Sequence, residues 1–260
     1  MTERAEVHDA AAVGFDRAAG AYERARPSYP QEAVDHVVRE LGIGTGSTVV
    51  DLAAGTGKFT RLLVASGAHL LGVEPVPGMR SVLAEVVPEV EVLDGTAEAI
   101  PLADASADAV VCAQAFHWFD APRALAEIGR VLRRGGGLAV VFNIRDEGVP
   151  WVAEMTAMTG VYDAPRPHHT DSRRAFADQV AGDGGYGPVT VSTFRYEQHL
   201  DEDGLIERVA SQSWIAAMDD GERSTLLEQV RTLAHTHPHL AGRRTFVMPY
   251  DTEVAICHRR

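Results

Sequence analysis

The chain has 260 residues, of which 45% are hydrophobic, and a formal net charge of −13. This length suits one domain, or one domain with a substantial insertion, and the apolar content can build a full core. The acidic balance argues against a nucleic-acid substrate, which calls for a basic surface. No apolar run approaches the roughly 20 residues that cross a bilayer, and residues 1–12 lack the apolar stretch of a signal peptide.

The cysteines and histidines point to no redox or metal chemistry. Cys112 and Cys257 lie within predicted strands, where we expect small core residues, and a reducing cytoplasm fits this expectation. The histidines at 168–169 and in the run 235–239 have no cysteine or carboxylate partners at zinc spacing. We therefore expect a cytoplasmic protein without a metal site and without a membrane partner.

Residues 49–57 carry the clearest local signal in the chain. The apolar, β-branched pair Val49 and Val50, which leads into Asp51, indicates a buried strand, and Gly55 and Gly57 indicate a tight turn after it. Apolar residues at helical spacing over 58–65 predict the helix that follows. A strand, a glycine turn and a helix in this order form a candidate nucleotide-binding unit, although an ordinary tight turn has the same pattern.

The residues around this turn indicate which ligand it would take. Asp51 ends the strand, where a carboxylate suits an ammonium or sulfonium group better than a pyrophosphate. Thr60 stands where a dinucleotide fingerprint has its third glycine, and Lys58 is followed by Phe59 rather than by the Ser or Thr of a phosphate loop. The pattern therefore disfavours a dinucleotide and a nucleoside triphosphate.

Further strands and helices alternate up to residue 143. The second strand, from His69, ends at Glu74 and Pro75, where an acid can accept both ribose hydroxyls, although a salt-bridged surface glutamate is the plainer interpretation. This alternation predicts a doubly wound α/β sheet whose loops share one edge. The remaining elements that we expect here are strands at 90–93, 107–114 and 138–142, a helix at 124–132 and a turn at 133–137.

The second half of the chain is less regular. We expect a cap insertion over 147–188, on the rim of the active site, in which Trp151, Met155, Met158 and Tyr162 supply apolar surface. A dimer-forming or stabilising appendage is the alternative. The other expected elements are helices at 151–162, 172–180, 205–218 and 222–235, and strands at 189–200 and 245–257.

At this point residues 15–143 resemble the class I S-adenosylmethionine (SAM)-dependent methyltransferases. The segments VVDLAAGTGKFT, GVEP, LDGTAEAIPL, ADAVVCAQAFHWF and EIGRVLRRGGGLAVV are similar to the family's ordered motifs. The resemblance implies a seven-stranded sheet whose last strand is antiparallel and lies between the fifth and sixth. It also implies that SAM binds to a set of residues, namely Asp51, Ala53, Gly55, Gly57, Glu74, Pro75, Met79, Gly95, Thr96, Ala97, Ala113 and Gln114.

Two positions depart from the family pattern, and the N-terminal segment resembles a narrower group. Ala53 replaces the first glycine of the usual loop, and Thr96 stands where an acid is common. The stretch FDRAAGAYERARPSYP is similar to small-molecule members of the trans-aconitate methyltransferase type, in which an N-terminal arm folds over the cofactor. This resemblance suggests that Tyr22, Arg26 and Tyr29 belong to such an arm, with Arg26 on the cofactor carboxylate; an amphipathic lid without chemistry is the alternative.

Methyl transfer from a sulfonium is an in-line displacement in which the protein mainly supplies orientation. His117 follows the fourth strand and is the candidate catalytic residue, as a general base for a hydroxyl acceptor; a packed histidine beside Trp118 is the alternative. Phe116 and Trp118, with Tyr22, are candidate aromatic faces for the sulfonium. The candidate anchors for an acidic acceptor are Arg26, Arg145, Arg173 and Arg174.

The sequence thus predicts a SAM-dependent methyltransferase that acts on a small molecule, such as a carboxylate or hydroxyl compound, and releases S-adenosyl-L-homocysteine (SAH). Its expected parts are an N-terminal arm or lid at 1–46, a SAM-binding core at 47–146, the cap insertion at 147–188 and the rest of the core sheet at 189–260. The alternatives are a SAM-binding protein that does not methylate and, less well supported, an NAD-dependent oxidoreductase. The sequence leaves open whether the chain forms a homodimer.

Overall fold

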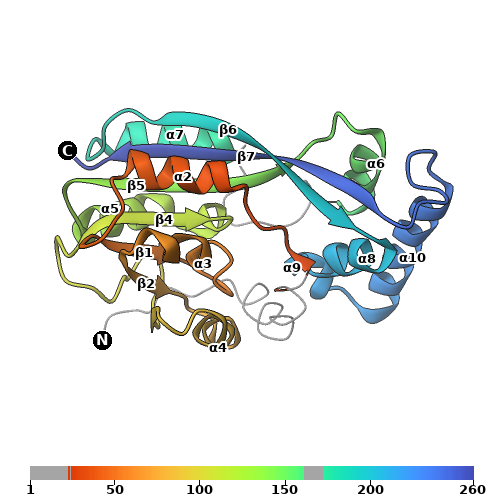
Figure 1. The fold of residues 1–260 in the computed structure, drawn as a ribbon, viewed down its shortest axis with the longest axis horizontal. Helices are drawn as coiled ribbons and strands as arrows, with labels where there is room; N and C mark the ends of the chain where they lie inside the picture. Colours follow the sequence, from red (N-terminus) through yellow and green to blue (C-terminus); the bar gives the residue numbers. More distant parts are fainter. Residues whose placement is uncertain (1–22, 24, 161–171) are drawn as a thin grey trace.

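The computed structural model describes residue 23 and residues 25–160 and 172–260. These residues form a seven-stranded sheet with helices on both faces, and a helical unit that lies beyond one end of the sheet (Figure 1). The long strands β6 and β7 are antiparallel and connect the sheet to this unit (Figure 1). None of the helices in the described ranges has the length and apolar composition that crossing a membrane requires.

The strand order in the described sheet is β3-β2-β1-β4-β5-β7-β6. Strands β1 to β5 pair in parallel, whereas β7 is antiparallel to both of its neighbours, β5 and β6. This topology confirms the predicted α/β fold, including the position of the last strand. The strands are β1 (Thr48–Leu52), β2 (His69–Val73), β3 (Glu91–Leu93), β4 (Ala107–Ala113), β5 (Leu132–Arg145), β6 (Thr190–Leu200) and β7 (Phe246–His258).

The helices that cover the sheet divide between its two faces because side chains alternate along each strand. Val49 and Val111 pack with α2 (Gln31–Glu40), α3 (Thr60–Leu63) and α4 (Pro77–Val86). Their neighbours Val50 and Val110 point the other way and pack with α5 (Ala121–Val131) and α7 (Ser172–Asp183). The sheet is therefore buried on both sides, and ligands have access at its edges. Short 3-10 helices complete this part at η1 (Val64–Ser66) and η2 (Phe116–Trp118).

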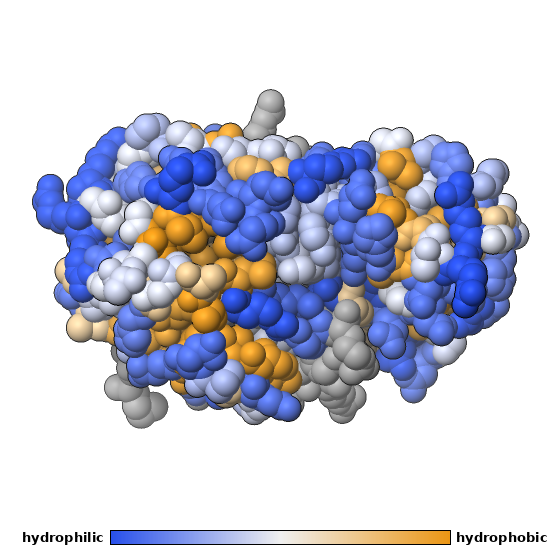
Figure 2. Space-filling view, in the orientation of Figure 1, coloured by the Kyte–Doolittle hydropathy of each residue, from blue (hydrophilic) through white to orange (hydrophobic). Residues whose placement is uncertain are grey.

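A separate apolar cluster holds the helical unit together. It joins α6 (Pro150–Met158), α8 (Glu202–Ala210), α9 (Ser213–Ala216) and α10 (Asp220–Thr236) to the ends of β6 and β7. Asp201 and Asp219 accept backbone N–H groups at the starts of α8 and α10, which fixes where these helices begin. Figure 2 shows apolar side chains on the part of one face formed by the sheet and its helices, and hydrophilic side chains in the middle of that face.

The segment 147–188 divides between the two clusters. Helix α6 packs with α8 and α10, whereas Phe176 and Val180 of α7 pack against α5. Trp151 and Met155 are 3% and 0% exposed, and the role of this segment as a substrate cap stays a prediction. They are core residues of the helical unit, because α8 and α10 bury the apolar face of α6. Tyr162 lies outside the described residues.

Two secondary-structure predictions need correction. The sequence predicts a turn at 133–137, but β5 begins at Leu132 because Gly135 N–H and Gly136 C=O pair with the backbone of Arg259. The expected helix at 205–218 is interrupted, because Gln212 adopts an extended conformation (φ −73°, ψ 130°) between α8 and α9. Glycine and helical periodicity are local signals, and here pairing and packing with distant residues override them.

Candidate functional site

Asp51 lies at the end of β1 and is 2% exposed. The Thr60 hydroxyl at the start of α3 donates to Asp51 Oδ2 at 2.5 Å. The other oxygen, Oδ1, is buried and has no hydrogen-bond partner among the residues that the structure describes. A buried acceptor that lacks a partner is unfavourable in an isolated protein, so Oδ1 is a candidate contact for a ligand donor.

Glu74 lies at the neighbouring end of β2 and is 5% exposed. Its Oε2 accepts the N–H of Gly55 at 2.9 Å, and its Oε1 accepts the N–H of Val76 at 2.9 Å. The side chain therefore connects the glycine loop to the turn after β2. Each carboxylate oxygen can accept a second hydrogen bond, which leaves Glu74 able to receive hydroxyl groups.

These two buried acids affect each other electrostatically. Burial raises the pKa of Asp51 to about 7, the Thr60 hydroxyl opposes this rise, and the nearby charge of Glu74 adds to it. Burial also raises the pKa of Glu74, against the two backbone N–H donors that favour its charged form. Acids with pKa values raised in this way gather at functional sites. A cation that bound between them would relieve the unfavourable charge.

The backbone next to Asp51 is strained where it approaches the same pocket. Ala53 has φ +55° and Gln114, after β4, has φ +60°, a left-handed conformation that non-glycine residues rarely adopt. Both residues line the pocket beside Asp51. Ala53 therefore holds a conformation that a glycine would adopt without strain, at a cost of about 1–2 kcal/mol. Strain of this kind persists where a binding site requires a particular backbone shape.

The described residues of the N-terminal arm cross the carboxyl edge of the sheet. The Glu23 carboxylate accepts the Thr56 hydroxyl at 2.5 Å and Nη2 of Arg61 at 2.6 Å, and it forms an ion pair with Lys58 at 3.7 Å. Farther along the arm, the C=O of Ser28 accepts Asn143 Nδ2 at 2.8 Å. The arm is therefore attached both to the glycine loop and to the end of β5.

A cavity of about 70 Å³ lies between this arm, the glycine loop and the ends of β4 and β5. Its volume is well below the roughly 300–1,000 Å³ of ligand pockets, so a ligand of nucleoside size needs more room than this cavity offers. The described residues that line it are Arg26, Pro27, Tyr29, Asp51, Ala53, Ala54, Gly55, Thr56, Lys58, Phe59, Ala113, Gln114, Asn143 and Arg208.

The structure brings together one group of the predicted site residues and separates another. Arg26, Asp51, Ala53, Gly55, Ala113 and Gln114 line the cavity with Tyr29, which also packs edge-on against Phe59. Glu74 reaches this group through its hydrogen bond to Gly55. The remaining predicted residues do not line this cavity, and those that the structure describes are Gly57, Pro75, Met79, Gly95, Thr96, Ala97 and His117. Tyr22 lies outside the described residues.

Three predicted site residues outside the cavity, Thr96, His117 and Phe116, have different surroundings. Thr96 Oγ1 is buried and has no hydrogen-bond partner in the described part of the chain, so it is a candidate contact for a ligand. His117 lies near Trp118 and Phe142, at ring-centre distances of 5.0 and 5.7 Å, and its catalytic role stays a prediction. Phe116 is 5% exposed and packs within the core, and its contact with the sulfonium stays a prediction.

Among the residues of the site that sequence reasoning missed are four with charged or amide side chains, namely Glu23, Lys58, Asn143 and Arg208. Asn143 follows the apolar run of β5, so its place at the sheet edge was available from the pattern. Arg208 lies in α8, far along the chain, and no local motif marks it. Of the predicted acid anchors, Arg145 donates to Gln212 Oε1 at 2.8 Å and does not line the cavity. The side chains of Arg173 and Arg174 lie outside the described part.

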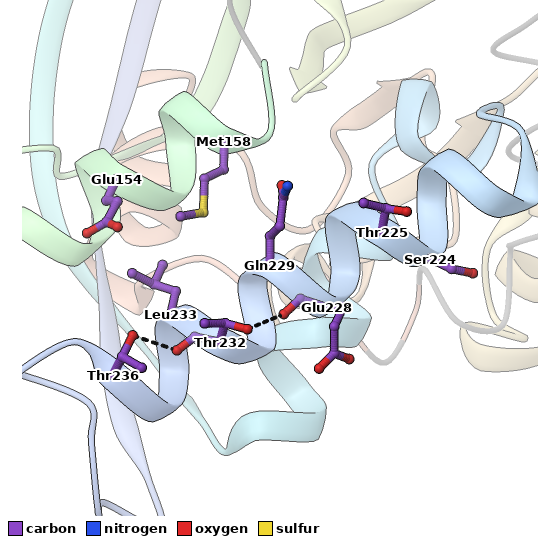
Figure 3. Close-up of a pocket in the computed structure, with 9 residues that line it drawn as sticks. All are labelled: Glu154, Met158, Ser224, Thr225, Glu228, Gln229, Thr232, Leu233 and Thr236. Atoms are coloured by element: carbon purple, nitrogen blue, oxygen red, sulfur yellow. Dashed lines mark hydrogen bonds between the residues drawn. The ribbon is translucent and has the colours of Figure 1, made fainter.

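A second, larger pocket lies in the helical unit. It has a volume of about 600 Å³ and is lined by residues of α6 and α10. Figure 3 shows Met158, Gln229 and Leu233 extending into the space between the two helices. Thr232 and Thr236 donate their hydroxyls to C=O groups of their own helix, as the dashed lines in Figure 3 show. This pocket holds neither strained backbone nor a pair of buried acids, so we assign the candidate site to the sheet edge.

Comparison with known proteins agrees with this choice. Residues 50–140 match a methyltransferase domain family. An uncharacterized methyltransferase of Mycobacterium tuberculosis is 40% identical over 247 residues, which cover 95% of each chain. The chain belongs to the class I SAM-dependent methyltransferases. An uncharacterized methyltransferase-like protein of Schizosaccharomyces pombe is 34% identical over 232 residues, covering 89% of this methyltransferase and 90% of the relative.

The fold of the methyltransferase recurs in solved structures. The YcgJ protein of Bacillus subtilis superposes with a TM-score of 0.58 at 18% identity, covering 89% of this chain and 99% of that one. A geranyl diphosphate methyltransferase in complex with SAM superposes with a TM-score of 0.52 at 16% identity, covering 88% of this chain and 85% of that one. Family membership also removes the predicted alternative of an NAD-dependent oxidoreductase.

The residues of this methyltransferase fit SAM. Asp51 Oδ1 offers a partnerless buried acceptor for the α-ammonium group, and Thr96 Oγ1 is partnerless where the resemblance expects the adenine. Glu74 keeps acceptor capacity for the ribose. The two acids together suit a ligand that carries positive charge on its ammonium and sulfonium groups.

The raised pKa of Asp51 predicts a pH-dependent affinity for SAH. Asp51 must be ionised to hold the ammonium group, and its pKa is about 7. Affinity should therefore rise with pH up to about 7 and then level off, and below that value it should fall by up to about tenfold per pH unit. Calorimetric titrations of SAH across this range measure the effect. The control is Asp35→Asn, which changes an exposed acid of α2 and should leave the pH dependence of SAH affinity unchanged. A wild-type affinity that does not vary with pH would contradict the assignment of Asp51.

Proposed function

We propose that this methyltransferase transfers the methyl group of SAM to a small-molecule acceptor inside the cavity at the carboxyl edge of the sheet. The observation that carries the proposal is the pair of buried acids, Asp51 and Glu74, at adjacent strand ends with acceptor capacity left over. The arm that crosses this cavity supports a small acceptor, because a macromolecule needs an open surface. When bound, SAM supplies a methyl group already activated by the sulfonium charge.

The protein's own residues orient the reactants and exclude water. Asp51 fixes the amino-acid end of the cofactor, Glu74 fixes the ribose, and the strained backbone of Ala53 and Gln114 shapes the space between them. Orientation of this kind can contribute roughly 7–11 kcal/mol to a displacement. The arm, attached through Glu23 and Ser28, closes the cavity against solvent.

Product detection tests this proposal. SAM is incubated with the protein and with sets of small carboxylates, phenols, alcohols and amines, and SAH formation is followed by mass spectrometry. We expect acceptor-dependent SAH formation with one chemical set, and a loss of that formation in Asp51→Asn. SAH formation only with added protein or nucleic acid, or no binding of SAM at all, would contradict the proposal.

Glu23 provides a test of the arm as a gate. Its carboxylate is 18% exposed and holds Thr56, Lys58 and Arg61 of the glycine loop and α3. Glu23→Gln removes the negative charge but keeps the size of the side chain. Because charge-assisted hydrogen bonds contribute about 1.5–3 kcal/mol each, we expect SAH to dissociate about tenfold faster or more.

Stopped-flow displacement of SAH measures this dissociation rate. Glu32→Gln is the matched control, because Glu32 is an exposed residue of α2 outside the arm's contacts. An unchanged dissociation rate in Glu23→Gln would show that the arm does not control access to the site.

A further inference from the structure

Arg208 of α8 presents a buried guanidinium to the same cavity as Asp51 and Gln114. The residue is 6% exposed. Its Nε donates to the Tyr250 hydroxyl at 3.2 Å, whereas its Nη1 has no hydrogen-bond partner among the residues that the structure describes. A guanidinium stays charged in proteins, and a buried charge without a counter-charge is strongly unfavourable. The side chain is therefore prepared for an anion that the described residues do not provide.

The guanidinium is held in place by a chain of hydrogen bonds. Tyr250 of β7 is fully buried, and its hydroxyl donates to Gln198 Oε1 of β6 at 3.1 Å. Gln198 Nε2 in turn donates to the C=O of Ala25 in the arm at 3.0 Å. Arg208 is thus oriented by two strands and by the arm that closes the cavity, and a fixed orientation lowers the entropy lost on binding.

The charges around the cavity separate a cation-binding place from an anion-binding place. Asp51 is the single acid among the described lining residues, and its Oδ1 and Arg208 Nη1 both lack partners, so the two groups do not satisfy each other. Arg26 and Lys58 add positive charge to the lining. A cofactor and acceptor that together place an ammonium group at Asp51 and a carboxylate at Arg208 would provide partners for both side chains.

We propose that Arg208 binds a carboxylate group of the methyl acceptor, which names the substrate class of the proposed function and rests on it. The methyltransferase domain match ends at residue 140, before α8 begins, so Arg208 belongs to the part of the chain outside the matched cofactor-binding core. A planar guanidinium matches a carboxylate in geometry as well as in charge. The cofactor also carries a carboxylate, so the experiment must distinguish binding of Arg208 to the cofactor from binding to the acceptor.

The test compares the wild type, Arg208→Met and Arg208→Lys by calorimetry in two stages. SAH is titrated first. Acetate, succinate, citrate and benzoate are then titrated into the SAH-saturated proteins, each beside the corresponding amide. Arg195→Met is the matched control, because Arg195 is an exposed arginine of β6 that pairs with Asp146 and Asp251 outside the cavity.

We expect the wild type to bind at least one carboxylate about tenfold or more tightly than its amide, and Arg208→Met to lose this preference with SAH affinity changed less than about twofold. Arg195→Met should keep both affinities. If Arg208→Met lost as much affinity for SAH as for the carboxylate, the guanidinium would be assigned to the cofactor and the inference would be overturned. A wild type that binds no carboxylate more tightly than its amide would also overturn it.

Failure of the wild type to bind SAH would appear in the first stage and would refute the proposed function itself, together with this inference. If Arg208→Met does not fold, as judged by its circular dichroism, Arg208→Lys carries the test. It keeps the charge but loses the planar fork, so its carboxylate affinity should fall while SAH binding persists. Full carboxylate affinity in Arg208→Lys would then contradict the geometric part of the inference.

Discussion

Asp51→Asn is expected to weaken SAH binding by about a hundredfold. The variant keeps the size of the side chain and an acceptor for the Thr60 hydroxyl, but it loses the charge and the partnerless Oδ1. Truncating a buried, charge-assisted hydrogen bond costs about 1.5–3 kcal/mol, and an uncompensated ammonium beside an amide N–H adds to this. Calorimetric titration with SAH measures the change, and an affinity within threefold of the wild type, or about 0.7 kcal/mol, would contradict the assignment.

The same substitution should stabilise the unliganded protein at alkaline pH. The pKa of Asp51 is about 7 in the folded state against an ordinary value of 3.8, so the folded state binds more protons between these values. The contribution of Asp51 to stability is therefore present at acidic pH and is lost as pH rises through about 7. The amide of Asp51→Asn leaves a buried N–H donor in place of Oδ1, which offsets part of this gain in stability. We therefore expect the free energy of unfolding of Asp51→Asn to exceed that of the wild type by about 1–3 kcal/mol at pH 8.

Denaturant unfolding at pH 4 and pH 8 tests this linkage. The difference between Asp51→Asn and the wild type should be largest at the higher pH and should nearly vanish at the lower pH. Asp35→Asn, which changes an exposed acid of α2, should show no such dependence. If Asp51→Asn were less stable than the wild type at both pH values, burial of the Asp51 charge would not destabilise the unliganded protein.

Gly57→Ala is expected to destabilise the fold by about 2–4 kcal/mol. Gly57 has φ +82°, and a Cβ at this position would meet Leu83 Cδ1 at 2.4 Å and Val87 Cγ2 at 3.2 Å. Both neighbours are buried in the core under α4, so they have little room to move. Thermal or denaturant unfolding measures the loss.

Gly55→Ala is the matched control for this prediction. Gly55 also has positive φ, +58°, but a Cβ there would meet no atom within 4 Å. It should therefore cost only about 1 kcal/mol of stability. Because Gly55 lines the cavity and donates to Glu74, its substitution should instead weaken SAH binding. Equal destabilisation by the two variants would show that contact with Leu83 does not decide why position 57 is glycine.

Local patterns predicted the site core correctly because its parts follow one another along the chain. The second strand starts at His69, as the pattern indicated, and Asp51 and Glu74 lie at neighbouring strand ends because β1 and β2 pair in parallel register. A buried strand that ends in an acid and a glycine turn specifies this arrangement through its own residues.

The rest of the site depends on contacts between distant segments. Arg208 reaches the cavity from α8, and Glu23 reaches the glycine loop across 33 residues of sequence. No periodicity or turn residue marks either side chain, because each is positioned by packing and hydrogen bonds formed only in the folded chain. The same reason explains why the pattern around Trp151 does not reveal that its side chain packs in the core of the helical unit.

A crystal structure of the protein with SAH tests the central claim most directly. The account predicts the α-amine within hydrogen-bonding distance of Asp51 Oδ1 and the ribose hydroxyls at the Glu74 carboxylate, with the arm at residues 23–30 moved to admit the ligand. Density for SAH at another place, such as the pocket between α6 and α10, or contacts that leave Asp51 Oδ1 without a donor, would contradict it.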